Sequence, residues 1–130
     1  MKILVLFSML FCHIVNDYNI QGWLANAKQK QWWSENAPQE MYKRDYLIAL
    51  FEHAFSWAFM VEIPIWIYNI MSNNYISIIT FYMCILNTVI HAYIDDLKAN
   101  KRTINLIQDQ TCHLVQIVAT WLIYILFLYK

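Results

Sequence analysis

Four long apolar runs, separated by polar segments, dominate the pattern of this chain. They cover Ile3 to Ile20, Tyr46 to Met71, Tyr75 to Ile94 and Thr111 to Tyr129. Each run is near the ~20 residues that a helix needs to cross the hydrocarbon core of a bilayer. One glycine and two prolines give too few turn signals for an all-β protein. The pattern predicts one all-α domain over residues 1–130, an integral membrane bundle of four transmembrane helices at about 3–20, 38–71, 74–98 and 103–130.

The polar segment from Gln21 to Asp45 mixes aromatic and basic side chains. These are Trp23, Trp32, Trp33, Tyr42, Lys28, Lys30, Lys43 and Arg44. Such a mixture is typical of the membrane–water interface, so we expect an amphipathic interfacial segment between helices one and two. Pro38 suits the first turn of helix two. Pro64 predicts a kink in that helix inside the membrane.

The first apolar run also resembles a secretory signal peptide. Lys2, the apolar stretch Ile3 to Cys12 and the triplet Ala25-Asn26-Ala27 would form its three regions. However, His13 and Asp17 interrupt the run, and a discarded peptide has no use for them. We therefore expect this run to stay in the protein as its first transmembrane helix.

Composition agrees with lipid as the solvent of most of the chain. Charged residues make up 14% of the sequence, whereas about a quarter of the residues in a soluble domain are charged. The formal net charge is zero and there is no basic tract, so the electrostatic footprint of a nucleic-acid-binding protein is missing. Cys12, Cys84 and Cys112 each lie among apolar residues, which indicates small hydrophobic side chains rather than a disulfide framework.

Lysine and arginine are distributed unevenly among the connections. Four crossings place the segments 21–45 and 98–102 on the same side of the membrane, and these segments hold seven of the nine basic residues. The other two, Lys2 and Lys130, lie at the termini. The positive-inside rule then puts both termini outside and both basic loops in the cytoplasm.

Ionisable residues inside three predicted helices form pairs four positions apart. The pairs are His13 with Asp17, His91 with Asp95, and Asp109 with His113. Side chains at i and i+4 share a helical face, where a carboxylate can orient an imidazole or share a cation with it. Helix two adds His53, so each predicted helix carries one histidine.

The four histidines also lie at a similar depth. They are seven to eleven residues from the nearest polar boundary residue on the cytoplasmic side, or roughly 10 to 16 Å at 1.5 Å per residue. Because the predicted helices alternate in direction, we expect the histidines and the three aspartates to meet in the cytoplasmic half of the bundle.

Three carboxylates at this depth, with little positive charge nearby, need a compensating partner, since each would otherwise cost several kcal/mol. Protonation would compensate them, Lys98 could neutralise one, and one or two divalent metal ions would do so best. Mixed imidazole and carboxylate ligands suit zinc, manganese or iron, whereas calcium and magnesium prefer oxygen. The candidate metal ligands are His13, Asp17, His53, His91, Asp95, Asp109 and His113. The alternative is a metal-free polar or proton-relay network of the same residues. We interpret Glu62 as a separate group that faces a cavity or is linked to Pro64.

The same residues give the chain a resemblance to a known family. In chain order the matching stretches are His13-Ile-Val-Asn-Asp17-Tyr-Asn-Ile-Gln21 with Trp23 and Lys28, then His53, His91-Ala-Tyr-Ile-Asp95-Asp-Leu-Lys98, and Asp109-Gln110-Thr-Cys-His113. Together they resemble the bacterial and phage membrane proteins known as domain of unknown function 3307. The resemblance spans nearly the whole chain and implies a compact multi-helix protein of the bacterial inner membrane. It implies no activity, and this chain departs from the family in its short length and its long polar insert at Lys28 to Asp45.

Three functional hypotheses follow. The first is a metal-dependent membrane hydrolase that acts on a lipid or lipid-linked phosphate, with Lys98 and Gln110 as the catalytic residues that bind an anionic head group or oxyanion. The second is a proton or metal-ion conductor that uses the same histidines and aspartates. The third is a non-enzymatic membrane effector, for example one encoded by a phage. The sequence leaves the substrate and the oligomeric state open.

Overall fold

The computed structural model describes residues 2–72 and 78–128, and every regular element within these ranges is helical. In chain order the elements are α1 (Lys2–Ile14), the π-helical turn η1 (Val15–Ile20), α2 (Leu24–Ala27), α3 (Lys30–Asn36), the 3-10 turn η2 (Glu40–Tyr42), α4 (Asp45–Met71), α5 (Ile78–Ala99), α6 (Leu106–Ile123) and the π-helical turn η3 (Tyr124–Leu128). The prediction of an all-α protein is confirmed for the described residues.

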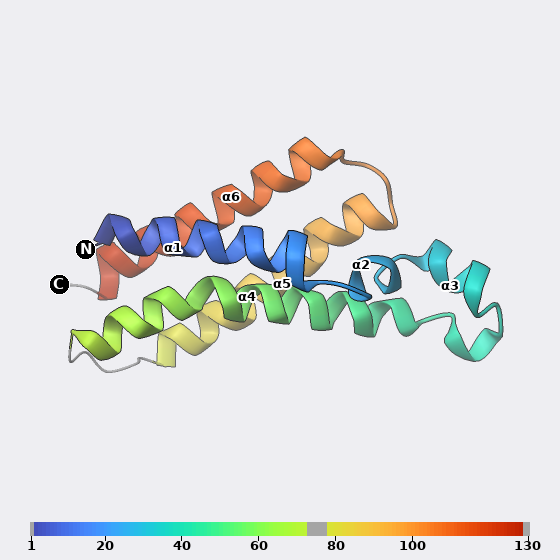
Figure 1. Cartoon of the computed structure of the whole chain (residues 1–130), viewed down its shortest axis with the longest axis horizontal. Helices are drawn as coiled ribbons and strands as arrows, with labels where there is room; N and C mark the ends of the chain where they lie inside the picture. The colour runs from blue at the N-terminus through green and yellow to red at the C-terminus, as the bar shows by residue number, and fades with distance from the viewer. Residues whose placement is uncertain (1, 73–77, 129–130) are drawn as a thin grey trace.

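Four long helices lie side by side along the long axis of the molecule and alternate in direction (Figure 1). α4 packs against both α1 and α5. α1 begins at the same end of the bundle at which η3 finishes. The short helices α2 and α3 lie at the opposite end, together with the connection between α5 and α6. The two segments rich in basic residues therefore share one end of the bundle.

The bundle buries many polar side chains beside an apolar core that includes Met9, Ile65 and Ile117, and its outer surface is largely apolar. The buried residues of α4 recur every three or four positions and include His53, Trp57 and Glu62. On its other face the side chains of Phe51 and Phe55 are exposed. Large exposed apolar side chains also cover α1, α5 and α6. Helices surrounded by lipid have this arrangement, because their ionisable groups face the bundle interior.

Three helical segments are long and apolar enough to cross a membrane: Lys2–Ile20, Glu40–Met71 and Ile78–Ala99. α6 is less apolar because it contains several polar residues, of which Asp109, His113 and Gln116 are buried. The structure thus supports a membrane protein with three membrane-length apolar helices, and a fourth crossing stays a prediction.

Two helices begin later than the sequence analysis predicted. Where helix two was expected from residue 38, η2 forms instead and stacks the Tyr42 ring on Trp33 at 6.3 Å between centroids. This aromatic contact competes with a longer helix. α6 was expected from residue 103 but starts after Asn105, which forms a capping box with Gln108. The predicted beginning of helix three and end of helix four lie outside the described residues. α4 continues through Pro64 as a helix, and the kink stays a prediction.

Candidate metal centre

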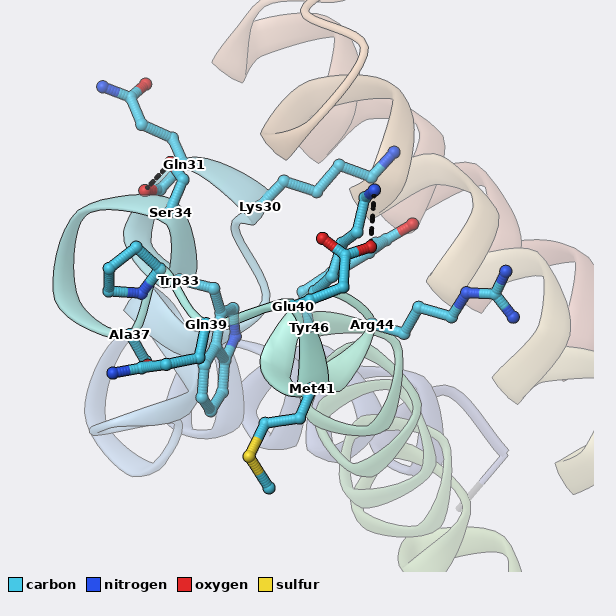
Figure 2. Close-up of a pocket in the computed structure, with 12 residues that line it drawn as sticks. Lys30, Gln31, Trp33, Ser34, Ala37, Gln39, Glu40, Met41, Arg44 and Tyr46 are labelled. Carbon is cyan, nitrogen blue, oxygen red and sulfur yellow. Dashed lines mark hydrogen bonds and ion pairs between the residues drawn. The ribbon is translucent and has the colours of Figure 1, made fainter.

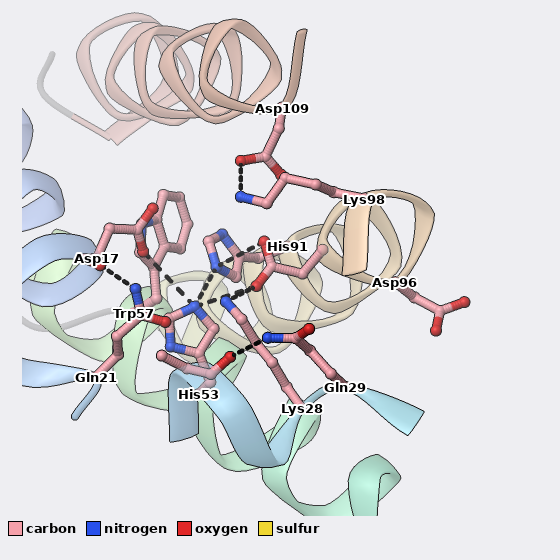
Figure 3. A network of polar contacts seen from close by, with 12 residues as sticks. Asp17, Gln21, Lys28, Gln29, His53, Trp57, His91, Asp96, Lys98 and Asp109 are labelled. Atoms are coloured by element: carbon pink, nitrogen blue, oxygen red, sulfur yellow. Dashed lines mark hydrogen bonds and ion pairs between the residues drawn. The ribbon is translucent and has the colours of Figure 1, made fainter. Parts of the chain in front are cut away.

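The seven predicted ligands form one network, which we call the His/Asp cluster, at the end of the bundle that carries α2. It comprises His13, Asp17, His53, His91, Asp95, Asp109 and His113, and all seven are buried. Contacts between nitrogen and oxygen atoms of 3.9 Å or less connect them without a break. Figure 3 shows how side chains from α4, α5, α6 and η1 point toward one another here.

A π-helical turn places Asp17 in the cluster. The backbone N–H of Gln21 donates to the backbone carbonyl oxygen of Asn16, five residues earlier. This bond widens the helix where Asn16 and Asp17 are both buried. Asn16 Nδ2 donates to Ser56 Oγ at 2.9 Å and ties the turn to α4. Asp17 Oδ2 then lies 3.6 Å from His13 Nδ1. Such turns often occur at functional sites, and this one turns a carboxylate inward.

Trp57 organises the imidazoles. Its Nε1–H donates to His13 Nδ1 at 2.8 Å. Because an indole N–H only donates, this imidazole nitrogen carries no proton. The Trp57 ring also stacks on His91 with centroids 4.2 Å apart, and His91 stacks on His113 at 4.0 Å. The sequence analysis missed Trp57, although it lies four residues after His53 and so shares its helical face.

Asp95 is the centre of the cluster. Its Oδ2 lies 3.2 Å from His53 Nε2, and its Oδ1 lies 3.3 Å from His113 Nε2 and 3.9 Å from His91 Nε2. The Nε2 atoms of His53 and His91 are 3.2 Å apart. In contrast, the Nδ1 atoms of these three histidines are buried and have no hydrogen-bond partner among the described residues. The Nε2 atoms therefore face the carboxylates and one another.

Two sets of three side chains have the geometry to hold a metal ion. One is Asp17, His53 and His91, the other is His91, Asp95 and His113, and within each set the ligand atoms lie within 4.8 Å of one another. A tetrahedral ion with bonds of ~2.0–2.1 Å spaces its ligand atoms ~3.3–3.4 Å apart. The 3.2 Å between the Nε2 atoms of His53 and His91 fits this spacing. Because the sets share His91, its Nε2 can serve only one ion.

Two lysines pair with two of the three aspartates. Lys28 Nζ lies 2.5 Å from Asp95 Oδ2, and Lys98 Nζ lies 2.5 Å from Asp109 Oδ2. The expectation of little positive charge near the carboxylates is therefore wrong for Asp95, whereas Asp109 is paired with Lys98, the lysine that the sequence offered as a partner for one carboxylate. Asp17 has no lysine or arginine partner among the described residues, and its Oδ1 is buried there without a hydrogen bond. Asp17 is thus the carboxylate that lacks a cation.

Lys28 was not among the predicted site residues. The sequence analysis assigned it to the interfacial segment, but its side chain is only 8% exposed. Gly22 adopts a φ of 47° directly after η1, a conformation that favours glycine, and α2 then packs against α4. Helical periodicity could not reveal Lys28, because it reaches the cluster through this turn and not along a long helix.

The two predicted catalytic residues, Lys98 and Gln110, lie beside the cluster. The Lys98 side chain is 28% exposed, so it borders both the cluster and the outside. Gln110 Nε2 donates to Asp17 Oδ2 at 3.3 Å and to Asp109 Oδ2 at 3.1 Å. Gln110 therefore bridges two carboxylates of the cluster.

A pocket of about 350 Å³, which we call the basic pocket, lies against both lysines. It is lined by Gln21, Ala25, Lys28, Gln29, Lys98, Ala99 and Arg102. Three of these residues are basic and none is acidic, so the pocket favours an anion. Because Lys28 and Lys98 also contact Asp95 and Asp109, the basic pocket and the cluster share two side chains.

A second pocket of about 940 Å³ lies beside α3 and η2 (Figure 2). Its lining includes Lys30, Trp33, Arg44 and Tyr46 and no residue of the cluster. Trp33 belongs to an aromatic group with Trp23, Trp32 and Tyr42, whose ring centroids lie 5.0–6.3 Å from their neighbours. This mixture of aromatic and basic side chains suits a lipid–water boundary and contributes no ligand to the candidate metal centre.

A separate buried polar region, the Glu62 network, comprises Glu62, Asn87, Gln116, Thr120 and Tyr124. Asn87 Nδ2 donates to Glu62 Oε1 at 2.9 Å, and Tyr124 OH donates to Glu62 Oε2 at 3.4 Å. Asn87 Oδ1 in turn accepts hydrogen bonds from Gln116 and Thr120. Glu62 therefore interacts directly with α5 and η3, and through Asn87 with α6, and not only with its own helix as a group linked to Pro64.

Comparisons with protein-family models, with curated proteins and with solved structures gave no match for this chain. The resemblance to domain of unknown function 3307 stays a prediction.

Proposed function

We propose that this chain is a four-crossing membrane protein whose His/Asp cluster holds a divalent metal ion and hydrolyses a phosphate ester of a lipid or lipid-linked phosphate. The observation that carries the proposal is that Asp17, unlike Asp95 and Asp109, has no lysine partner among the described residues. The buried Oδ1 of Asp17 lies 3.6 Å from His53 Nε2 and belongs to a three-ligand set with His91. A divalent ion would supply the cation that this carboxylate lacks.

The fourth crossing is α6 together with η3. The segment Leu106–Leu128 would be ~34 Å long at 1.5 Å per residue, enough for a hydrocarbon core of ~30 Å. Its polar residues Asp109, His113 and Gln116 are buried, while Val115 and Leu122 point outward. The same pattern of inward polar and outward apolar side chains occurs on the three apolar helices.

We further propose that the end of the bundle with α2 and the basic pocket faces the cytoplasm and that both termini are external. Seven of the nine basic residues lie in the two segments at that end, which the positive-inside rule assigns to the cytoplasm. A bacterial inner membrane is the proposed location.

A three-ligand site has an open position, which is the arrangement of catalytic zinc. We propose Asp17, His53 and His91 as ligands of zinc, manganese or iron. Such an ion makes water nucleophilic at neutral pH and polarises a phosphoryl oxygen. His113 Nε2 lies 3.3 Å from Asp95 Oδ1 and 3.4 Å from Asp109 Oδ1, so this nitrogen would carry a proton and could give it to the leaving group. The water oxygen would bond to phosphorus as the ester P–O bond breaks, the departing alcohol oxygen would take the His113 proton, and the proton lost by the water would restore it.

Elemental analysis of detergent-purified protein tests the proposal directly. Wild-type protein should hold about one zinc, manganese or iron ion per chain, and His91→Ala should lower the metal affinity or the rate of phosphate release from a short-chain phosphatidic acid at least ~10-fold. Asp96→Asn is the matched control, since Asp96 follows Asp95 but pairs with Lys101 at 3.4 Å. Wild-type protein that takes up none of these metals after reloading would overturn the proposal.

Cysteine labelling in intact cells tests the orientation. The native residues Cys12, Cys84 and Cys112 are first replaced. In that background, Lys101→Cys should be protected from a membrane-impermeant reagent, while Lys130→Cys should react with it. The opposite result would invert the topology without affecting the metal site.

A proton or ion conductor is the second candidate, and the Glu62 network favours it. Gln116 is three residues beyond His113 on α6, and its Nε2 donates to the Asn87 carbonyl at 2.9 Å. The two buried polar regions thus adjoin along α6. In proteoliposomes a conductor should show a proton flux that Glu62→Gln abolishes while the metal content of the protein is unchanged. A hydrolase should show no such flux.

A further inference from the structure

The ammonium groups of Lys28 and Lys98 have hydrogen-bonding capacity left for a ligand. Each ammonium has three donors, and each makes one hydrogen bond within the described residues, Lys28 to Asp95 and Lys98 to Asp109. Both ammonium-bearing side chains also line the basic pocket, with Arg102 as a third cation. A phosphate monoester carries enough negative charge and enough acceptor oxygens to use these donors.

The same two lysines hold carboxylate oxygens of the cluster, and one of these carboxylates, Asp95, belongs to a candidate ligand set. Asp95 Oδ2 lies 2.5 Å from Lys28 Nζ and 3.2 Å from His53 Nε2. This oxygen therefore lies within ligand spacing of His53 but is held by an ammonium. Asp109 Oδ2 is held in the same way by Lys98. Cation binding by these carboxylates is a competition between a lysine and the metal ion.

We infer that a phosphate-bearing anion in the basic pocket raises the affinity of the His/Asp cluster for its metal ion. The anion draws Lys28 and Lys98 toward the pocket. The released Oδ2 of Asp95 becomes available to the metal, and the negative charge of Asp109, which contacts His113, is no longer neutralised by Lys98 and favours a cation in the cluster. This inference rests on the proposed function and names its substrate class as a phosphate monoester. Thermodynamic linkage requires the metal to raise the affinity for phosphate by the same factor.

The inference can be tested with Mn²⁺, whose free form is measured by electron paramagnetic resonance. The full chain is reconstituted in phosphatidylcholine nanodiscs and titrated with Mn²⁺ alone, with inorganic phosphate, or with phosphatidic acid in the nanodisc. Empty nanodiscs of each composition correct for Mn²⁺ bound to lipid or to phosphate. We expect a rise in Mn²⁺ affinity of at least ~5-fold, the lower range of coupling between two sites. A response to phosphatidic acid alone indicates a lipid head group, and a response to both indicates any accessible phosphate.

Lysine variants test the route of this coupling. Lys28→Met and Lys98→Met should each bind Mn²⁺ more tightly than wild type without phosphate and should show a smaller response to it. Lys98 is the more exposed of the two, so its replacement disturbs folding least. Lys43→Met is the matched control, because Lys43 pairs with Glu40 at the surface and does not line the basic pocket; it should keep the full response.

The outcomes separate this inference from the proposed function. Mn²⁺ binding that ignores both phosphate sources overturns the inference and leaves the metal site standing. A full phosphate response in both lysine variants overturns it as well, since the coupling would then bypass the lysines. Absence of Mn²⁺ binding under every condition overturns the inference, and it overturns the proposed function as well if the protein takes up neither zinc nor iron.

Discussion

The His/Asp cluster and the Glu62 network are both buried and polar, but they accommodate carboxylates in different ways. In the cluster, Asp95 and Asp109 each contact a lysine ammonium at 2.5 Å. Glu62 instead contacts neutral donors, Asn87 and Tyr124, among the described residues. The cluster is supplied with cations by α2 and the end of α5, whereas the Glu62 network is built from α4, α5, α6 and η3.

This difference follows from the position of each carboxylate along the bundle. Long lysine side chains near helix ends can follow an apolar surface and bring a charge to a buried carboxylate. A carboxylate at the level of Glu62 depends on hydrogen bonds from amides and hydroxyls. Removing a carboxylate should therefore destabilise the cluster strongly, because it leaves an unpaired buried ammonium, and should affect the Glu62 network much less.

The largest effect is expected for Asp95→Asn. This change removes the negative partner of Lys28 and replaces one of the two oxygens that face His53 and His113 with an NH2 group. Breaking one side of a buried ion pair costs ~3–5 kcal/mol. The free energy of unfolding in mixed detergent micelles measures the loss. Asp96→Asn serves as the control, because its pair with the more exposed Lys101 is worth only ~0–1 kcal/mol. Equal losses in the two variants would show that Asp95 is not the centre of the cluster.

Metal addition should have the second-largest effect and should distinguish the His/Asp cluster from the Glu62 network. At a free metal concentration of 100 Kd, binding to the folded state adds ~2.7 kcal/mol to the free energy of unfolding. Wild-type protein and Glu62→Gln should gain this amount alike, and a chelator should remove it. His91→Ala should gain much less, since His91 belongs to both candidate ligand sets. Equal gains in His91→Ala would place the metal outside both candidate ligand sets.

Trp57→Phe should have an intermediate effect that is confined to the cluster. Phenylalanine keeps an aromatic ring to stack on His91 but removes the N–H that donates to His13 Nδ1. A buried nitrogen left without its donor costs ~1–3 kcal/mol, measurable as a lower unfolding midpoint. Trp32→Phe is the control, because no hydrogen bond of the Trp32 indole occurs within the described residues. If Trp57→Phe left the unfolding midpoint unchanged, the hydrogen bond from Trp57 would not be what organises His13.

The meeting of the four histidines could be predicted because it depends on regular helices. Spacing of four residues puts His91 above Asp95, and alternating helix directions bring the pairs to one level. Lys28 could not be predicted in the same way, since it reaches Asp95 through the turn at Gly22 and the short helix α2. The start of α4 was missed for a similar reason, because the contact between Tyr42 and Trp33 is tertiary and leaves no periodic signal.

Glu62→Gln should have the smallest effect, a change of less than ~1 kcal/mol in the free energy of unfolding, comparable to one ordinary hydrogen bond. Glutamine keeps an oxygen that accepts from Asn87, and the Tyr124 hydroxyl can accept from the new amide because a phenol both donates and accepts. Glu62→Ala should cost clearly more, since it leaves the Asn87 amide without an acceptor and opens a cavity. The two variants and Asp95→Asn should be compared in one detergent. If Glu62→Gln lost as much stability as Asp95→Asn, the charge on Glu62 would matter as much as that on Asp95, and the contrast between the two regions would be wrong.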